Sequence, residues 1–282
     1  MPAHIKYCLA TLLAVVGLLV GSAAQGTELN YQHLAAALEQ YVDDTGLVYY
    51  QGLKANPQEL KEFATQLDLL DRAVYEQWSD QAKIAFWINT YNALTLQAII
   101  DNYPIQASFW KAAIYPKNSI RQISGVWDEL QFGVMGKKMT LDEIEHKVLR
   151  AEFNEPGIHI ALVCAAIGCP PLRNEPYSGK HLDAQLNDQA RKFLNNPIKF
   201  RLDIQTATVA LSPIFKWFGA DFVKTYGTDK RFSDRSDPER AVLNFISAYL
   251  DDGDLSYLTI GAYSIDYLDY DWSLNERTSG LS

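Results

Sequence analysis

The strongest constraint on the fold is an apolar run of helical length, residues 81–103, which reads QAKIAFWINTYNALTLQAIIDNY. Ser79 and Asp80 precede it as N-cap residues and Pro104 follows it, so one long helix is predicted between these signals. Its apolar residues occupy nearly every side of the helix. A helix that is apolar all round is usually buried, and we therefore expect this helix to lie at the centre of the fold.

Two amide side chains, Asn89 and Asn92, lie one turn apart within this helix. A buried amide without partners costs about 1–3 kcal/mol, so both must be hydrogen-bonded. They either brace a neighbouring loop or face a cleft, and in the second case Asn92 is a candidate catalytic residue and Asn89 a candidate binding residue. Trp87 and Tyr91, four residues apart, are core residues or a surface on which a ligand stacks.

The N-terminus resembles a secretory signal peptide. Lys6 precedes an apolar run, Leu9 to Val20, and small residues follow, which predicts cleavage near Ala24. The run has about a dozen residues, fewer than the roughly 20 that span a bilayer. We therefore expect an exported protein, periplasmic or secreted, with no stable membrane insertion after signal cleavage.

Net charge narrows the range of partners. The chain has a formal net charge of −9, and removal of residues 1–24 with their one lysine changes it to −10. Such a surface repels nucleic acid and anionic lipid. No nucleic-acid partner is expected, and the expected partner is an unidentified small molecule or a peptide. We expect residues 25–282 to form a single globular domain.

The remaining elements favour the α+β class because helices and hairpins are mixed without regular strand–helix alternation. Helices are predicted over 28–43, after Asn56-Pro57, at 140–150 behind a Thr140–Glu143 capping box, at 181–194 and from 237. Hairpins are predicted at Gly136 and over 198–212, a buried strand at 158–164, a one-turn helix ending at Gly219, and an edge strand in the tail. The central helix is expected to pack on a small, mostly antiparallel sheet.

Five segments in order resemble the domain-of-unknown-function family 547, found in bacterial exported proteins and plant proteins: FWINTYNAL, LDEIEHKVLR, HIALVCAAIGCPPLR, LDAQLNDQARKFL and LSPIFKWFGADF. The resemblance covers roughly residues 78–222 and implies the family's fold, whereas the family's name assigns no biochemistry. The positions that match its shared pattern are Trp87, Asn89, Tyr91, Asn92, Glu145, His146, Leu149, Arg150, His159, Cys164, Cys169, Pro170, Leu172 and Arg173.

The matching residues could support cysteine catalysis. A nucleophilic thiolate needs a histidine or another group that lowers its pKa, and a third group that orients the base. The candidates are Cys169 and Cys164 with His159, His146, Glu145 and Asn92. His159 and Cys164 are five apart, so on a straight strand their side chains would face opposite sides. The arrangement loosely suggests papain- and transglutaminase-type hydrolases, although here the central helix carries no cysteine.

Three other interpretations compete with cysteine catalysis. Two cysteines in an exported protein usually form a disulfide, and a Cys164–Cys169 bridge across a tight turn would leave no nucleophile. Two buried, inert thiols are the second alternative. Zinc is the third, but Cys-x4-Cys lacks a second pair of ligands, so no metal and no cofactor is expected.

Arg150 and Arg173 are candidate binding residues. Glu145 and Arg150 are five apart and would not meet on one helix face, so Arg150 needs another partner, Glu152 or a ligand carboxylate. Salt bridges between elements are the simpler interpretation, and an anion site shared with Arg173 is the functional one.

Two hypotheses follow from the sequence. The chain is an exported cysteine-dependent hydrolase or transferase that acts on an amide-type substrate. Alternatively, it is a non-catalytic cell-envelope binding or scaffold module in which the Cys164–Cys169 disulfide is structural.

Overall fold

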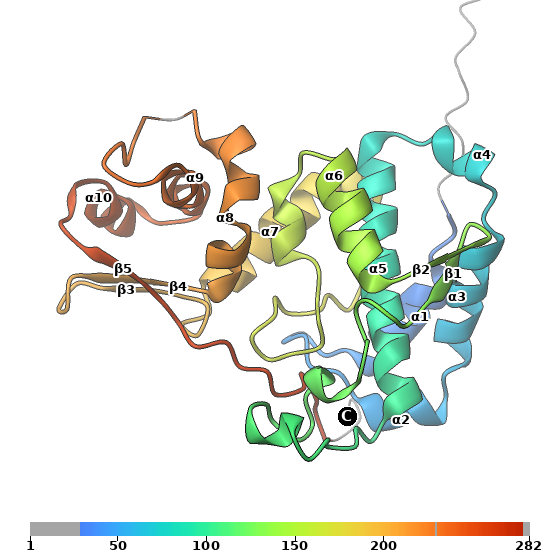
Figure 1. Cartoon of the computed structure of the whole chain (residues 1–282). Coiled ribbons are helices and arrows are strands. Elements are labelled where there is room, and N and C mark those ends of the chain that lie inside the picture. Colours follow the sequence, from blue (N-terminus) through green and yellow to red (C-terminus); the bar gives the residue numbers. More distant parts are fainter. Residues whose placement is uncertain (1–28, 229, 279–282) are drawn as a thin grey trace, which may run out of the picture.

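The computed structural model describes residues 29–228 and 230–278 (Figure 1). Its helices are α1 (Gln32–Tyr41), α2 (Tyr50–Ala55), α3 (Gln58–Leu69), α4 (Arg72–Glu76), α5 (Asp80–Asn102), α6 (Arg150–Glu152), α7 (Leu182–Leu194), α8 (Pro213–Tyr226), α9 (Asp237–Ser247) and α10 (Asp252–Ile260). Its strands are β1 (Phe132–Val134), β2 (Lys137–Met139), β3 (Phe200–Asp203), β4 (Thr208–Leu211) and β5 (Ser264–Tyr267). The expected α+β class is confirmed.

Helix α5 is the central buried helix that the apolar run predicts. The Ser79 hydroxyl accepts a hydrogen bond from the Ala82 N–H at 3.2 Å, and the helix ends one residue before Tyr103-Pro104. Nearly every residue from Ile84 to Ile100 is buried, on all sides of the helix. Its neighbours are α2, α3, α7 and the segments 143–149 and 179–181.

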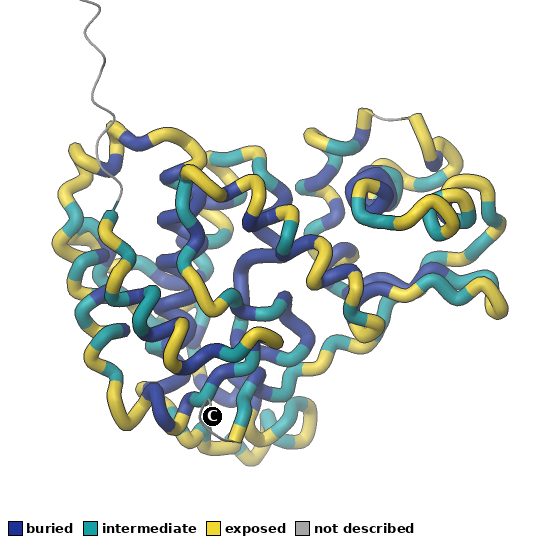
Figure 2. The backbone as a smooth tube through the Cα atoms, turned by 180° about the vertical axis from the view of Figure 1, so that it is seen from behind, coloured by how far each residue is buried: buried dark blue, intermediate teal, exposed yellow. Residues whose placement is uncertain are grey.

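The apolar core consists of two clusters. One surrounds α5 and includes buried residues of α1 and α3, and the other lies between α7, α8, α9 and strands β3 and β4. Figure 1 shows α8, α9, α10 and the sheet at one end of the molecule and α1 to α5 at the other. In Figure 2 the buried residues follow these two groups of elements, and the chain between them is also largely buried.

The core around the central helix includes residues of the small β1–β2 sheet but none of the three-stranded sheet, and the likeness to papain-type hydrolases is not confirmed. The three-stranded sheet has the order β3–β4–β5, with β3 and β4 antiparallel and β5 parallel to β4 as an edge strand. Its buried residues, Phe200, Val209 and Leu211, belong to the second cluster and not to the one around α5. The β1–β2 hairpin packs on α3 instead.

Residues 158–164 do not form the expected strand. Pro156–Ile160 is a short 3₁₀ helix, begun by Pro156 and capped by the Glu155 carboxylate, which accepts from the Gly157 N–H at 2.8 Å. The segment then continues without regular structure. The Asn92 side chain is hydrogen-bonded to the Ala161 carbonyl and the Val163 N–H. In a strand, these backbone groups would be hydrogen-bonded to a neighbouring strand.

Helix α8 continues beyond Gly219, where a one-turn helix was expected to end. Gly219 faces α9, and a Cβ atom there would lie 3.3 Å from the Cβ of Pro238 and 3.6 Å from Val242. The glycine therefore allows close packing of the two helices and does not end α8. At the expected β1–β2 turn, Met135 and Gly136 both have positive φ (50° and 70°), as a tight hairpin turn requires.

Candidate functional site

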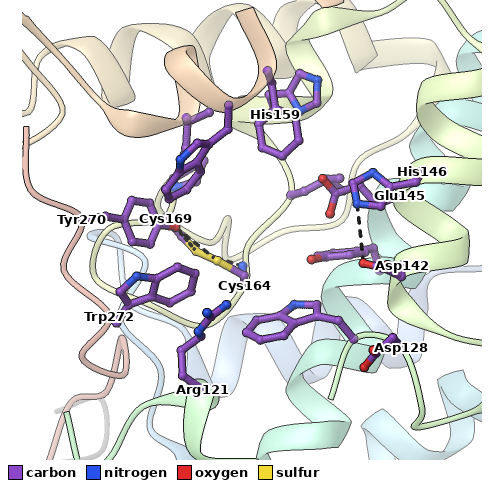
Figure 3. Close-up of a pocket in the computed structure, with 17 residues that line it drawn as sticks. Arg121, Asp128, Asp142, Glu145, His146, His159, Cys164, Cys169, Tyr270 and Trp272 are labelled. Atoms are coloured by element: carbon purple, nitrogen blue, oxygen red, sulfur yellow. Dashed lines mark hydrogen bonds and ion pairs between the residues drawn. A yellow bond between two sulfur atoms is a disulfide. The ribbon is translucent and has the colours of Figure 1, made fainter. Parts of the chain in front are cut away.

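A pocket of about 390 Å³ lies between the cysteine loop, α8 and the C-terminal tail (Figure 3). Its size falls within the range usual for small-molecule sites. Six of its lining residues have large aromatic side chains: Tyr91, Trp127, Trp217, Phe218, Tyr270 and Trp272. Of the residues predicted as site residues, the pocket brings together Tyr91, Glu145, His146, His159, Cys164 and Cys169.

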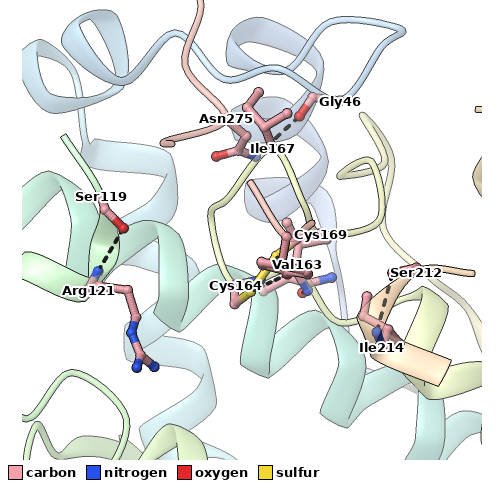
Figure 4. Close-up of a disulfide and its surroundings, with 12 residues drawn as sticks. Gly46, Ser119, Arg121, Val163, Cys164, Ile167, Cys169, Ser212, Ile214 and Asn275 are labelled. Carbon is pink, nitrogen blue, oxygen red and sulfur yellow. Dashed lines mark hydrogen bonds between the residues drawn. A yellow bond between two sulfur atoms is a disulfide. The ribbon is translucent and has the colours of Figure 1, made fainter. Parts of the chain in front are cut away.

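The two cysteines are joined in a disulfide in the pocket wall, with Cα atoms 6.2 Å apart (Figures 3 and 4). The Tyr270 hydroxyl lies 3.2 Å from the Cys164 Sγ and donates to the Cys169 Sγ at 3.1 Å. The Cys164 N–H also donates to the Cys169 Sγ, at 3.0 Å. In this bridged state neither cysteine offers the thiolate that nucleophilic catalysis needs.

The C-terminal tail holds the cysteine loop in place. The Ile167 and Gly168 N–H groups donate to the carbonyls of Ser273 and Asp271, at 2.8 and 2.7 Å. Gly168 lies directly under the Tyr270 ring, since a Cβ atom there would be 2.7 Å from it. The tail therefore positions the Tyr270 hydroxyl against the disulfide.

His159 is buried and directed away from the sulfur atoms. Its Nε2 lies 2.8 Å from Asp221 Oδ2, and its ring stacks on Phe218 with centroids 4.1 Å apart. Burial lowers the pKa of His159, whereas the hydrogen bonds from His159 and Arg150 hold the pKa of Asp221 well below its usual range. The histidine is thus part of an ion-pair cluster and forms no hydrogen bond with either cysteine in the described structure.

His146 and Arg150 lie beside this cluster. Arg150 Nη1 donates to His146 Nδ1 at 2.9 Å, and His146 Nε2 is 3.5 Å from Asp142. Arg150 also forms a two-point ion pair with Asp221, at 2.6 and 3.1 Å. The partner of Arg150 is therefore Asp221, where Glu152 or a ligand carboxylate was expected.

Glu145 is the acidic group in the pocket with an unusual pKa. Burial raises the pKa of its carboxyl, and the positive charges of His146 and Arg150 oppose this shift. Tyr91 donates its hydroxyl to Glu145 and accepts from Trp127. The segment 143–149 that carries Glu145 is a π-helix, and the expected Thr140–Glu143 capping box precedes it.

Arg121 was not predicted from the sequence and extends into the pocket (Figure 3). Its guanidinium lies 4.5, 4.8 and 5.4 Å from the ring centroids of Tyr115, Trp272 and Trp127, and it donates to the Tyr115 hydroxyl at 2.6 Å. Within the described part of the chain, Arg121 forms no ion pair with a carboxylate.

Five predicted site residues lie outside this pocket, and one of them is Arg150, which pairs with Asp221. The Asn92 amide is hydrogen-bonded to the backbone of residues 161 and 163. The Asn89 amide forms two hydrogen bonds with the backbone of Tyr177, each 2.8 Å long. These amides brace loops and do not face a cleft. Trp87 is a core residue that donates to the Tyr75 hydroxyl at 2.9 Å.

Arg173, the fifth, pairs with Glu175 and Asp188, both at 2.5 Å. Like Arg150 it is thus engaged by protein carboxylates, and the two arginines do not line a common cavity among those found in the described residues. Among the same residues, no three of the His, Cys, Asp and Glu side chains gather as metal ligands.

The pocket residues missed by the sequence analysis are Arg121, Trp127, Asp128, Asp142, Leu162, Ile214, Trp217, Phe218, Tyr270 and Trp272. The segments KWF and YLDYDW that carry four of the aromatic residues have an unusual aromatic content, which was the one available signal. Nothing in the sequence places the tail against the cysteine loop.

The fold and site define an α+β protein with an aromatic pocket that has a disulfide in its wall. Residues 75–194 match the model of the family described as "Protein of unknown function, DUF547", which supports the resemblance to that family over this part of the chain. The match ends before α8, whereas the resemblance was expected to reach residue 222. Neither the curated proteins nor the solved structures gave a match.

The expected signal peptide lies outside the described residues. Within residues 29–228 and 230–278, no helix combines the length and apolar character needed to cross a membrane.

Proposed function

We propose that the protein is an exported binding module whose pocket takes an organic carboxylate with a flat apolar body, either a small molecule or part of a peptide. The observation that carries this proposal is Arg121, whose guanidinium reaches the pocket, lies over aromatic rings and pairs with none of the described carboxylates, although Asp128, Asp142 and Glu145 line the same pocket. An arginine fork matches a carboxylate in two-point geometry, and aromatic walls bury an apolar body.

The rest of the pocket supports this class of ligand. Glu145 lies in the same pocket, and its raised pKa means that it holds its proton to a higher pH than an ordinary carboxyl does. Trp217 is 49% exposed and lies 4.9 Å from the Tyr270 ring, so a flat ligand could enter beside it. The disulfide closes one side of the pocket and fixes the loop that carries Pro170.

The test compares phenylacetate with its uncharged amide, phenylacetamide, by tryptophan fluorescence and calorimetry. Phenylacetate should bind at least about tenfold more tightly because a charged hydrogen bond contributes about 1.5–3 kcal/mol. Arg121→Gln should remove this preference. Arg235→Gln is the matched control, since Arg235 also stacks on a tyrosine, at 4.6 Å from Tyr263, but does not line the pocket. Equal binding of the two probes to the unmodified protein would contradict the proposal.

A cysteine-dependent hydrolase or transferase is the second candidate. The observation in its favour is that Cys164 shares the pocket with Glu145, His146 and His159. It requires reduction of the disulfide and a shift that brings a histidine to the sulfur. After mild reduction, maleimide should then label the folded protein and abolish a turnover that the reduced protein shows, whereas the binding module should show no turnover in either state.

A further inference from the structure

We propose a further activity that is independent of the ligand at Arg121: the Cys164–Cys169 disulfide exchanges with external thiols through the pocket, and Cys169 is the leaving group. The proposal depends on three features of the structure. They are the unequal exposure of the two sulfur atoms, the hydrogen-bond donors at Cys169, and a buried lysine behind the cysteine loop.

Access from the pocket differs between the two cysteines. Both cysteines line the aromatic pocket, but Cys164 is half-buried, whereas Cys169 is only 3% exposed and also lines a second cavity of about 210 Å³. Thiol–disulfide exchange requires the attacking thiolate to reach one sulfur atom along an open path. An incoming thiolate therefore meets the Cys164 Sγ first.

The donors at Cys169 favour its departure as a thiolate. Its Sγ receives the Cys164 N–H at 3.0 Å and the Tyr270 O–H at 3.1 Å. A disulfide sulfur is a weak acceptor, but the same donors bind an anion strongly. They therefore stabilise the products of bond cleavage more than the bridge itself, and exchange becomes faster when the leaving thiolate is stabilised.

Lys199 adds a positive charge on the far side of the loop. It is 2% exposed, lines the second cavity together with Cys169, and its ammonium donates to the carbonyl of Ile167, between the two cysteines. Burial lowers the pKa of Lys199 to about 8. Near neutral pH Lys199 is therefore still protonated in most molecules. A nearby cation favours a thiolate.

The exchange takes two steps. A thiolate R–S⁻ attacks the Cys164 Sγ, the bond between the cysteines breaks, and its electron pair leaves on Cys169 as a thiolate. A second R–S⁻ attacks the R-bearing sulfur of this mixed disulfide, so R–S–S–R leaves and Cys164 becomes a thiolate. The protein disulfide is reduced by two electrons, two external thiols are oxidised to one disulfide, and the protein thiolates take protons from water.

The first experiment measures reduction of the folded protein by glutathione at defined ratios of thiol to disulfide, with free thiols counted by mass spectrometry after alkylation. We expect reduction without denaturant. Tyr270→Phe should make reduction about tenfold less favourable, because one hydrogen bond to a charged sulfur is lost. Tyr267→Phe is the control, since Tyr267 lies in the same tail but in β5. Resistance to reduction until the protein unfolds, or equal behaviour of the two variants, would overturn the proposal.

The second experiment does not depend on Tyr270. With glutathione disulfide, the variant Cys169→Ala should form a mixed disulfide at Cys164 at least about tenfold faster than Cys164→Ala forms one at Cys169, because exchange follows access to the attacking sulfur. Circular dichroism checks that both variants are folded. Equal rates, or faster modification of Cys169, would contradict the assigned direction of attack.

Discussion

Asn92 shows how one side chain of the central helix determines the shape of a distant loop. Its amide nitrogen donates to the Ala161 carbonyl at 3.0 Å, and its amide oxygen accepts from the Val163 N–H at 2.9 Å. Residues 161–163 lead directly into Cys164, which lines the pocket. The amide therefore acts on the pocket by positioning its wall and not by contact with a ligand.

Replacement of Asn92 by alanine should lower the free energy of unfolding by about 2–3 kcal/mol, because two buried backbone groups lose their partners. Urea denaturation measures the change. Asn102→Ala is the control, since the Asn102 amide bonds only to the Ala98 carbonyl of its own helix and sits at the helix end. A loss no larger than that of the control would show that the two contacts do not support the loop.

Glu145 should make the folded protein less stable as the pH rises. Its folded pKa is raised, so the folded state holds the proton to a higher pH than the unfolded state does. At pH values below the unfolded pKa, about 4.3, both states are protonated and Glu145 has no differential effect. Above this pH, ionisation of Glu145 costs more free energy in the folded state than in the unfolded state.

Glu145→Gln should therefore be more stable than the unmodified protein near pH 7, with a difference that grows from about pH 4 upwards. Denaturation curves between pH 4 and 8 measure it. Glu143→Gln provides a control of opposite sign, because hydrogen bonds from Lys147 and the Thr140 backbone lower the pKa of Glu143. That variant should lose stability over the same pH range, and a parallel response of the two variants would contradict the argument.

Among the secondary-structure elements, those whose ends or periodicity are determined by nearby residues could be predicted from the sequence. The Ser79 cap and Pro104 define α5, the Thr140–Glu143 box begins the segment at 143, and the period of two defines β3 and β4. Each of these depends on contacts within a few residues. Sequence patterns report such contacts directly.

The errors came from tertiary contacts. Residues 158–164 have the composition of a strand, but the Asn92 amide takes the backbone groups that a neighbouring strand would use. Gly219 resembles a helix stop, but its missing side chain serves the packing of α8 on α9. Neither partner can be identified from the local sequence.

Gly168 lies where the cysteine loop contacts the C-terminal tail, and the effect of replacing it follows from the lack of room for a side chain there. A Cβ atom at residue 168 would lie 2.7 Å from the Tyr270 ring, closer than side chains pack. Gly168→Ala should force the tail away from the cysteine loop, lower stability by about 1–3 kcal/mol and alter the tryptophan fluorescence of the pocket. Thermal unfolding and emission spectra measure both effects.

Gly253→Ala is the matched control for Gly168. Gly253 lies in α10, and its added Cβ would meet only Asp251, at 3.4 Å. This variant should gain up to about 1 kcal/mol, because alanine is the better helix former. If both glycine variants changed stability in the same direction, the close contact with Tyr270 would not be the reason that residue 168 must be glycine.

At the scale of the whole molecule, the pocket draws on segments far apart in the chain. Tyr91 comes from α5, Arg121 from the short 3₁₀ helix Ile120–Gln122, Cys164 from the family region and Trp272 from the tail. The matched family region ends at residue 194, so α8 and the tail, which complete the aromatic wall, lie beyond it. The sequence therefore predicted the cysteine and histidine half of the site and missed the aromatic half.

The cellular compartment of the protein is also a property of the whole molecule, and the disulfide provides a test of it. Disulfides persist in oxidising compartments and are rare in the cytosol, so the bridge and the signal-like N-terminus should occur together. Protein collected from the periplasm or medium should begin near Gln25, and its unreduced mass should be two hydrogen atoms short of the reduced mass.

Val16→Asp tests this link, because a charge in the apolar run of a signal peptide opposes export. This variant should remain in the cytosol with residues 1–24 attached and with Cys164 and Cys169 reduced. Tyr7→Lys adds charge where a signal peptide is already basic and should be exported and bridged as before. If unmodified protein from the periplasm or medium kept residues 1–24, or if the cytosolic variant carried the bridge, then export and disulfide formation would be separate properties of this chain.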